Sequence, residues 1–334
     1  MTDGRPLGVG VMGCSSFALR AMLPAMALCD AVRLVAIASR DGDKARATAA
    51  GFPGCRPVDG YDGLLSDPEI DAIYMPLPTG IHREWVAAAL SAGKHLLVEK
   101  SLAMDAGEAA EMVAAARQRG LLLQENFLFP RHSQAAWVRR ELEGGTVGQL
   151  RFFRAAFTIP PLDPSNFRYQ AAAGGGALLD VGAYMVKSTL HFLGDEARLT
   201  DAAIEDDRDR GIDLAGAATF VAPSGVVSQT VWGFDTNYQC SWEFIGTAGR
   251  ILCRRALTPP PGHRPSVRVE RGNDGQELEL DADNHYLNQW YYFAAAARDP
   301  AAVRAETDAT ARQAELLAAV RSQALKLARG PAQR

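Results

Sequence analysis

The first 126 residues alternate short apolar segments with helical segments, and this alternation constrains the fold more than any other feature. Strands that alternate with helices of about 10–15 residues imply a parallel, doubly wound sheet, because each helix returns the chain to the same end of the sheet. We expect strands at Leu7–Met12, Ala31–Ser39, Ile70–Met75, Leu96–Glu99 and Leu121–Asn126. We expect helices at Phe17–Cys29, Asp41–Ala50, Ile81–Ala92 and Asp105–Arg119.

The pattern changes after residue 126, where alternation with period two becomes frequent. It predicts strands at Val147–Thr158, Asp213–Val221, Val226–Phe234, Gln239–Ile245, Gly249–Cys253, Ser266–Arg271 and Glu277–Leu280. Helices are expected at Ala177–Leu193, Tyr286–Ala297 and Thr307–Ala328. The second half is therefore expected to be α+β with a mainly antiparallel sheet. A chain of 334 residues is long for one core, so we predict two domains, 1–126 and 127–334.

Two smaller segments are interpreted by composition alone. The acidic run Glu205–Asp207 is expected to form a solvated turn. The aromatic run Trp290–Phe293 is expected to belong to the core.

Composition excludes several classes of protein. The formal net charge of −4 provides no basic field for nucleic acid. No apolar run approaches the ~20 residues of a membrane span, and no signal peptide is visible. The five cysteines are an odd number without C-x-x-C spacing, which indicates reduced thiols in a cytoplasmic protein. The six histidines show no ligand-like pairing, so no metal site is expected.

A dinucleotide-binding turn is predicted after the first strand. The letters Gly8-x-Gly10-x-x-Gly13 match the usual pattern, but Gly8 and Gly10 fall inside the strand, whereas the phosphate turn must follow it. The register that starts at Gly13 is better. It assigns cofactor contacts to Gly13, Cys14, Ser15, Ser16, Phe17 and Ala18. Ser15 and Ala18 replace the second and third glycines of the pattern, and their small side chains still let the backbone approach a pyrophosphate. The alternative is an ordinary strand–helix turn.

The end of the second strand indicates which dinucleotide is bound. An acidic residue there would favour the ribose 2′-hydroxyl of NAD. Ser39 and Arg40 stand at this position instead, with Lys44 one helical turn later. Because a guanidinium suits a phosphate, we predict NADP(H), the alternative being a solvated Arg40.

Chemistry is indicated by a glycine-rich segment and by a lysine at a strand end. The segment Gly174–Tyr184 places Asp180 and Tyr184 four residues apart, on one face of a helix. Lys100 follows the apolar strand that ends at Glu99. An ammonium group beside a phenol favours the phenolate, so this pair suits the proton transfer of carbonyl–alcohol interconversion. The alternatives are a core tyrosine, an aspartate that caps the helix and a surface lysine.

These motifs occur in a characteristic order. Gly13-Cys14, Ser39-Arg40, Pro78-x-x-x-His82, Gly93-Lys-His95, Glu99-Lys100 and the Gly174–Tyr184 segment together resemble the glucose–fructose oxidoreductase / inositol dehydrogenase (Gfo/Idh/MocA) family over almost the whole chain. The resemblance implies a Rossmann domain and an open antiparallel sheet that packs against its counterpart in a homodimer or homotetramer. It also implies catalytic Lys100, Asp180 and Tyr184, and cofactor contacts from Pro76, Leu77, Pro78, His82, Glu99, Lys100 and Arg168.

A tyrosine at 184, with the segment Gln124–Phe129 and His132-Ser-Gln134, is most similar to the deoxysugar 3-ketoreductases of this family. The resemblance then implies NADPH-dependent reduction of the C3 ketone of a nucleotide-linked 3,4-diketo-2,6-dideoxyhexose, with dTDP as the nucleotide, in antibiotic-sugar biosynthesis. Two alternatives stay open. One is an NADP-dependent aldose or dihydrodiol dehydrogenase, and the other is a non-catalytic regulator that senses sugar or cofactor.

The sequence departs from the family at Ser101, where the family usually has proline after Glu-Lys. In the family that Lys–Pro bond is commonly cis. A cis bond before a residue other than proline costs about 2.5–4 kcal/mol relative to trans. We therefore expect the turn at Lys100 to differ from that of the family.

Overall fold

The computed structural model describes residues 4–328, which form two compact units. The first comprises the residues up to Asn126 together with Tyr286–Ala314, and the second comprises Phe127–His285 together with the residues from Glu315 onward. The expected division placed everything after residue 126 in one domain, whereas 286–314 group with the first unit. No helix within residues 4–328 is long and apolar enough to cross a membrane.

The first unit contains a six-stranded parallel sheet, as expected for a doubly wound fold. The spatial order is β3-β2-β1-β4-β5-β6, the order of a Rossmann fold. The strands are β1 (Leu7–Met12), β2 (Val32–Ser39), β3 (Arg56–Asp59), β4 (Ala72–Met75), β5 (His95–Val98) and β6 (Leu123–Glu125). Between them lie η1 (Ala18–Met22), α1 (Leu23–Ala27), α2 (Gly42–Ala49), α3 (Asp62–Leu65), η2 (Thr79–Ile81), α4 (His82–Ser91) and α5 (Ala106–Arg119).

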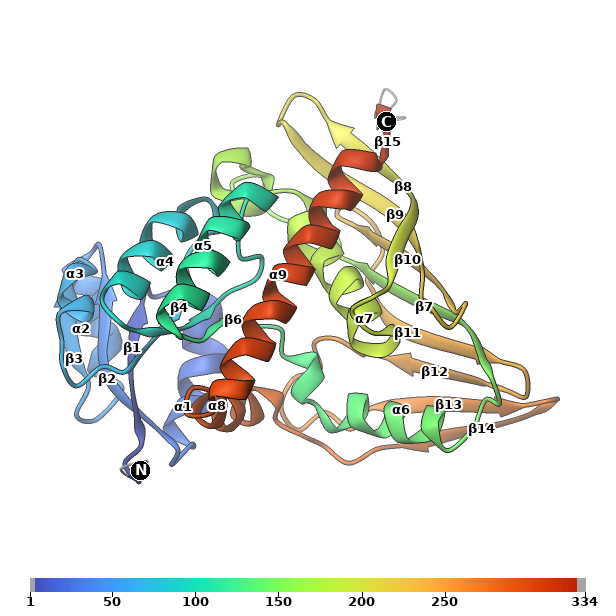
Figure 1. Cartoon of the computed structure of the whole chain (residues 1–334), viewed down its shortest axis with the longest axis horizontal. Helices are drawn as coiled ribbons and strands as arrows, with labels where there is room; N and C mark the ends of the chain where they lie inside the picture. Colours follow the sequence, from blue (N-terminus) through green and yellow to red (C-terminus); the bar gives the residue numbers. More distant parts are fainter. Residues whose placement is uncertain (1–3, 329–334) are drawn as a thin grey trace. The chain divides into compact units, whose positions relative to one another are not determined.

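Both faces of this sheet are covered, and β4 shows how. Ile73 and Met75 point into an apolar cluster that α4 and α5 complete, and these two helices lie side by side in Figure 1. Tyr74 points to the opposite face, because side chains alternate along a strand. There its ring meets Trp290 edge-on, with 5.5 Å between ring centres. Trp290 belongs to α8 (His285–Ala296), and its indole N–H donates to the Met22 carbonyl (2.9 Å). These contacts explain why the late segment joins the first unit.

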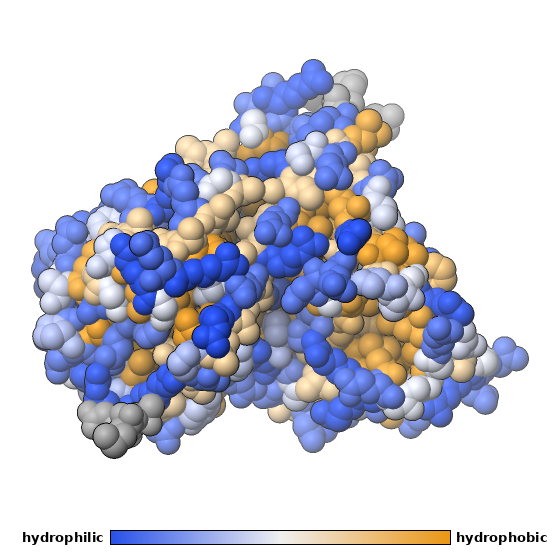
Figure 2. Space-filling model, in the orientation of Figure 1, coloured by the Kyte–Doolittle hydropathy of each residue, from blue (hydrophilic) through white to orange (hydrophobic). Residues whose placement is uncertain are grey.

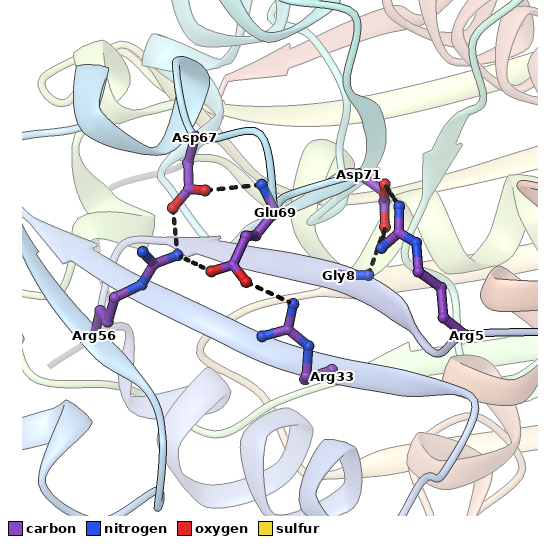
Figure 3. A network of polar contacts seen from close by, with 7 residues as sticks. All are labelled: Arg5, Gly8, Arg33, Arg56, Asp67, Glu69 and Asp71. Atoms are coloured by element: carbon purple, nitrogen blue, oxygen red, sulfur yellow. Dashed lines mark hydrogen bonds and ion pairs between the residues drawn. The ribbon is translucent and has the colours of Figure 1, made fainter. Parts of the chain in front are cut away.

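Close backbone packing explains the glycine at position 8. A Cβ there would lie 2.0 Å from the Glu69 carbonyl oxygen, so only glycine fits. The Gly8 N–H donates to Asp71 (2.8 Å), which also accepts two bonds from Arg5 (Figure 3). Although partial burial opposes it, these partners lower the pKa of Asp71. Gly8 is thus a packing glycine inside β1, as the chosen register of the phosphate turn requires.

The same edge carries a second group of ion pairs. The Arg56 guanidinium contacts Asp67 (2.6 Å) and Glu69 (2.8 Å), and Arg33 lies 3.6 Å from the other Glu69 oxygen (Figure 3). Arg56 opens β3, which the sequence analysis missed. Because β3 is a short edge strand with mostly exposed side chains, it has no apolar pattern to reveal it.

The second unit contains a nine-stranded sheet in the order β14-β13-β12-β11-β7-β10-β9-β8-β15. Only the β7–β10 and β8–β15 pairs are parallel, so the expected mainly antiparallel sheet is confirmed. Its strands are β7 (Leu150–Thr158), β8 (Arg198–Asp207), β9 (Ile212–Val221), β10 (Val227–Gly233), β11 (Gln239–Gly246), β12 (Arg250–Arg254), β13 (Ser266–Arg271), β14 (Asp274–Glu279) and β15 (Leu325–Ala328).

Helices cover one face of this sheet (Figure 1). They include α6 (Ser133–Glu143), η6 (Leu178–Gly182) and α7 (Ala183–Leu193). The aromatic core beneath α7 is dense, with Phe153 stacked on Phe244 at 4.9 Å. The Trp242 indole N–H donates to Ser188 of α7 (3.1 Å). Figure 2 shows apolar side chains gathered over this unit between α6 and α7, with hydrophilic side chains around them.

Three expectations about the second half were wrong. Glu205–Asp207 are not a turn but the end of β8, which runs between β9 and β15. The last helix, α9 (Pro300–Gln323), does not continue to residue 328, because Leu325–Ala328 pair with β8 as β15. Of the expected aromatic core, Trp290 and Phe293 are buried but Tyr291 is 42% exposed.

Candidate active site

The predicted phosphate turn follows β1 directly. Gly13 has φ of 113°, and a Cβ there would lie 2.7 Å from a Leu77 methyl carbon. The positive φ and the close approach of Leu77 both favour glycine at this position. The Ser15 hydroxyl accepts a hydrogen bond from the Ala18 N–H (3.1 Å) and caps the first turn of η1. Gly13–Ala18 thus forms a strand–turn–helix segment of the kind that cradles a pyrophosphate.

The end of β2 gathers the groups that were predicted to select NADP. Ser39 is buried and its hydroxyl accepts from the Asp41 N–H (3.2 Å). Asp41 in turn caps α2 by accepting from the Lys44 N–H (3.2 Å). Arg40 is exposed between them and lies near Tyr61; burial raises the pKa of Tyr61, and Arg40 opposes this rise. Ser39 and Arg40 therefore directly precede the Asp41 cap of α2, and Lys44 lies in the first turn of that helix.

The His82 ring lies between two loops and contacts the backbone of both. Its ring nitrogens lie 2.8 Å from the Leu77 carbonyl oxygen and 3.0 Å from the Leu102 carbonyl oxygen, and the ring is fully buried. Desolvation lowers the pKa of His82. Nearby, the Thr79 hydroxyl donates to the Ser101 carbonyl (3.1 Å). His82 therefore has no ring nitrogen left for a ligand, and it positions the loop Pro76–Pro78 and the loop after β5.

Lys100 follows Glu99 at the corner after β5. The Glu99 carboxylate accepts from the Tyr74 hydroxyl (2.7 Å) and from the Asn126 amide (2.6 Å). Desolvation raises the pKa of this carboxyl group, and the two donors oppose the rise. The peptide bond between Lys100 and Ser101 is cis, which is the isomer common in the family.

In the second unit, Asp180 and Tyr184 lie on successive turns, as predicted. Asp180 is in the π-helical turn η6, and Tyr184 is in the first turn of α7. Asp180 accepts from Arg168 Nε at 2.5 Å, and the Arg168 guanidinium also stacks over the Phe167 ring at 4.7 Å. Arg168 therefore positions Asp180 in this structure.

Tyr184 is 8% exposed and lies in an aromatic surround. Its ring packs edge-on against Phe127 and Phe157, with 5.3 and 5.2 Å between ring centres. The phenol is thus held by packing, which is one requirement for a positioned proton donor.

The glycine run brings chain segments together. A Cβ at Gly175 would lie 2.6 Å from the Arg168 carbonyl oxygen, and one at Gly176 would lie 2.5 Å from the Asp213 carboxylate. That carboxylate accepts from the Leu178 N–H (2.5 Å) and so caps the segment that carries Asp180. Burial raises the pKa of Asp213, against the effect of this hydrogen bond. Asp213 was not predicted as a site residue, although a carboxylate at the start of a buried strand is itself a signal.

No group of three or more potential metal ligands occurs within residues 4–328.

Two protein-family models match the chain. The oxidoreductase family with an NAD-binding Rossmann fold matches residues 7–127, and the Gfo/Idh/MocA C-terminal domain matches residues 136–252. The dTDP-3,4-didehydro-2,6-dideoxy-alpha-D-glucose 3-reductase of Streptomyces violaceoruber is 42% identical and covers 96% of each chain. The protein of the same description from Saccharopolyspora spinosa is 40% identical, over 95% of this chain and 97% of that one.

A solved structure is similar over its whole length. It is a 3-ketoreductase from Actinomadura kijaniata in complex with NADP and TDP-benzene, with a TM-score of 0.92, 39% identity and coverage of 97% of this chain and 100% of that one. Crystal structures of a tyrosine-to-phenylalanine variant and a lysine-to-alanine variant of that protein are also known. The chain studied here belongs to the Gfo/Idh/MocA oxidoreductase family.

Proposed function

We propose that this protein is an NADPH-dependent sugar 3-ketoreductase. Its substrate is a nucleotide-linked 3,4-diketo-2,6-dideoxyhexose, with dTDP as the nucleotide, and its product is an intermediate of deoxysugar biosynthesis for antibiotics. The observation that carries the proposal is the full-length similarity of about 40% identity to reductases of this substrate class, in a chain that retains Lys100 and Tyr184.

The variants known for the Actinomadura relative support the assignment of catalytic residues. The changed lysine and the changed tyrosine of that protein are separated by the same number of residues as Lys100 and Tyr184. Neither residue is lost here, which argues against a non-catalytic regulator.

The cofactor is bound by the first unit. Gly13–Ala18 holds the pyrophosphate, while Ser39, Arg40 and Lys44 hold the 2′-phosphate of NADPH. Pro76–Pro78 and the Glu99–Lys100 corner border the cofactor, with His82 fixing their backbone. Arg168, which pairs with Asp180 through its Nε, contacts a cofactor or substrate phosphate in this proposal. When bound, NADPH supplies the hydride that reduces the carbonyl carbon.

The protein's own residues move the proton. As the C3 carbonyl becomes an alkoxide, the Tyr184 hydroxyl transfers its proton to that oxygen and becomes a phenolate. Lys100 stabilises this phenolate and hydrogen-bonds the substrate oxygen, and water returns a proton to Tyr184 after the reaction. Asp180, held by Arg168, orients a substrate hydroxyl.

We also propose a cytoplasmic location and a homodimer, or a tetramer built from dimers. All five cysteines are free thiols, as expected in a reducing compartment. The sheet face opposite α7 carries Phe152 and Val231, which are 42% and 46% exposed. The same face has a hollow of about 580 Å³, lined by residues of β7 and β9–β12 such as Arg154, Thr219 and Leu252. A second copy would cover this apolar and partly charged surface.

The proton donor is tested by Tyr184→Phe, which keeps the ring and removes only the acidic proton. Turnover of the nucleotide-linked ketosugar should fall about 10²–10⁴-fold, while NADPH affinity stays nearly unchanged. Lys100→Ala should also lower turnover strongly. The turnover of the double variant should be only slightly lower than that of the less active single variant, because the two residues act as a unit.

Steady-state kinetics with NADPH and a panel of sugars measures these effects. Full ketone reduction by Tyr184→Phe would reject this tyrosine as the donor, and His132 would be tested next. Tyrosine-dependent turnover of free aldoses alone would favour an aldose dehydrogenase instead.

Cofactor preference is tested by Arg40→Ala. The unmutated protein should bind NADPH more tightly than NADH, and the variant should lose most of the difference. A charge-assisted phosphate contact contributes about 1.5–3 kcal/mol, which corresponds to roughly ten- to hundredfold in affinity. Fluorescence titration with both cofactors measures this. Arg83→Ala, an exposed arginine of α4 paired with Glu111, is the control. Equal dissociation constants in the unmutated protein contradict the assignment.

The helix cap is tested by Gly176→Ala. The new Cβ would displace the Asp213 carboxylate from the Leu178 N–H, so turnover should fall at least tenfold with NADPH affinity preserved. Gly194→Ala is the matched control, since Gly194 also has positive φ (89°) but has open space at its Cβ position. Equal turnover in both variants would show that the cap does not position Asp180 and Tyr184.

The dimer surface is tested by Phe152→Asp, which places a charge on the exposed sheet face. The unmutated protein should sediment as a dimer or tetramer at micromolar concentration, and the variant as a monomer. Leu28→Asp, at a residue of the first unit that is 68% exposed, should leave the assembly intact. Sedimentation of the unmutated protein as a monomer would disprove the proposed assembly.

A further inference from the structure

Two residues near one end of the nine-stranded sheet have an unusual backbone. Among residues 4–328, Asp235 (φ 58°) and Arg255 (φ 48°) are the non-glycine residues with positive φ. Asp235 lies in the connection from β10 to β11, and Arg255 directly follows β12, the neighbour of β11. A left-handed conformation is unfavourable for residues with a Cβ, and such residues concentrate where a ligand is bound.

Tyr238 lies in the same connection as Asp235. It precedes β11 and is 38% exposed. Burial, together with the neighbouring Cys240 side chain, raises the pKa of Tyr238, and the nearby Thr258 side chain opposes this rise. The Arg255 guanidinium lies 5.8 Å from the centre of the Tyr238 ring. The phenol therefore lies beside Cys240 and Thr258 while part of the ring stays accessible.

Arg255 is an exposed cation without an anionic partner in the described part of the chain. Many other arginines of this unit pair with carboxylates, as Arg264 does with Glu279 (2.6 Å) and Arg268 with Glu270 (2.6 Å). An arginine in an unfavourable backbone conformation, beside an aromatic ring and without a carboxylate, is available for an anion.

The sheet register places Tyr238 beside the surroundings of Tyr184. Cys240 of β11 pairs with Phe157 of β7, and the Phe157 ring packs against Tyr184 at 5.2 Å. Tyr238 stands two residues before Cys240 in the extended chain, so its side chain lies on the same face of the sheet. It is two residues further toward the sheet end, about 7 Å along the strand. A ligand that reaches Tyr184 at one end can therefore extend over Tyr238.

Two hydrogen bonds hold the chain around Tyr238, and one of them comes from the segment that carries Arg168. The Tyr169 hydroxyl donates to Asp235 (2.5 Å), and the Thr158 hydroxyl donates to the Asn237 carbonyl (2.5 Å). These bonds hold the β10–β11 connection in one geometry. Pre-organised contacts of this kind reduce the entropy that a ligand loses on binding.

We infer that Tyr238 and Arg255 form a subsite for the nucleoside diphosphate of the substrate. Arg255 binds the diphosphate, and the Tyr238 ring packs against the nucleoside. This inference rests on the proposed function and adds residues that read the nucleotide rather than the sugar. Guanidinium forks match phosphate oxygens, and aromatic side chains pack well on nucleobases.

Calorimetric titration of TDP into the protein saturated with NADP tests the subsite. Arg255→Ala should weaken TDP binding about ten- to hundredfold. Tyr238→Ala should weaken it at least severalfold. Neither variant should change NADP affinity. The matched controls are Arg254→Ala, the adjacent exposed arginine, and Tyr291→Ala, a tyrosine of similar exposure in the first unit. Both controls should bind TDP like the unmutated protein.

A further variant separates binding from folding. Arg255→Gly suits the left-handed backbone, so its melting temperature should equal or exceed that of the unmutated protein while TDP binding is lost. Unchanged TDP affinity in Arg255→Ala and Tyr238→Ala overturns the subsite alone. If the unmutated protein binds no TDP, both the proposed function and the subsite are overturned.

Discussion

A carboxylate that loses its water must find hydrogen-bond donors, and this requirement governs both segments that carry the proposed catalytic residues. Glu99 takes donors from Tyr74 and Asn126, which fixes the corner before Lys100. Asp213 takes the Leu178 N–H, which fixes the turn before Asp180 and Tyr184. In each unit, a desolvated carboxylate that takes no part in the reaction fixes the backbone next to a proposed reacting side chain.

Much of the fold could be predicted because its strongest signals are local. The bounds of β1 were predicted to the residue, since an apolar strand that ends in a glycine turn is visible in the sequence. The missed elements β3, β8 and β15 lie at or near sheet edges, where exposed and charged side chains obscure the alternation. The return of residues 286–314 to the first unit depends on long-range contacts, such as the bond from Trp290 to Met22. No local pattern contains that information.

The candidate site was predicted by position more reliably than by role. The register at Gly13 and the groups around Ser39 lie where the motif places them. His82 and the glycine run, however, contact the protein's own backbone, because a motif does not say which neighbour requires the small or polar residue. Asp213 has no motif of its own, and only the fold reveals that it caps the segment of Asp180.

In the second unit, the residues proposed for proton transfer and those proposed for nucleotide binding occupy different parts of one sheet. Packing on Phe157 and the cap by Asp213 support Tyr184, whereas Tyr238 and Arg255 depend on the β10–β11 connection and the end of β12. The contacts that hold Tyr184 and those that hold Tyr238 and Arg255 both involve β7 and β11, but they involve few of the same side chains. Recognition of the nucleotide can therefore change while proton transfer is retained, since substitutions more than about 7–10 Å apart without shared partners are usually additive. A fold organised in this way can keep one reaction and vary the carrier to which the sugar is attached.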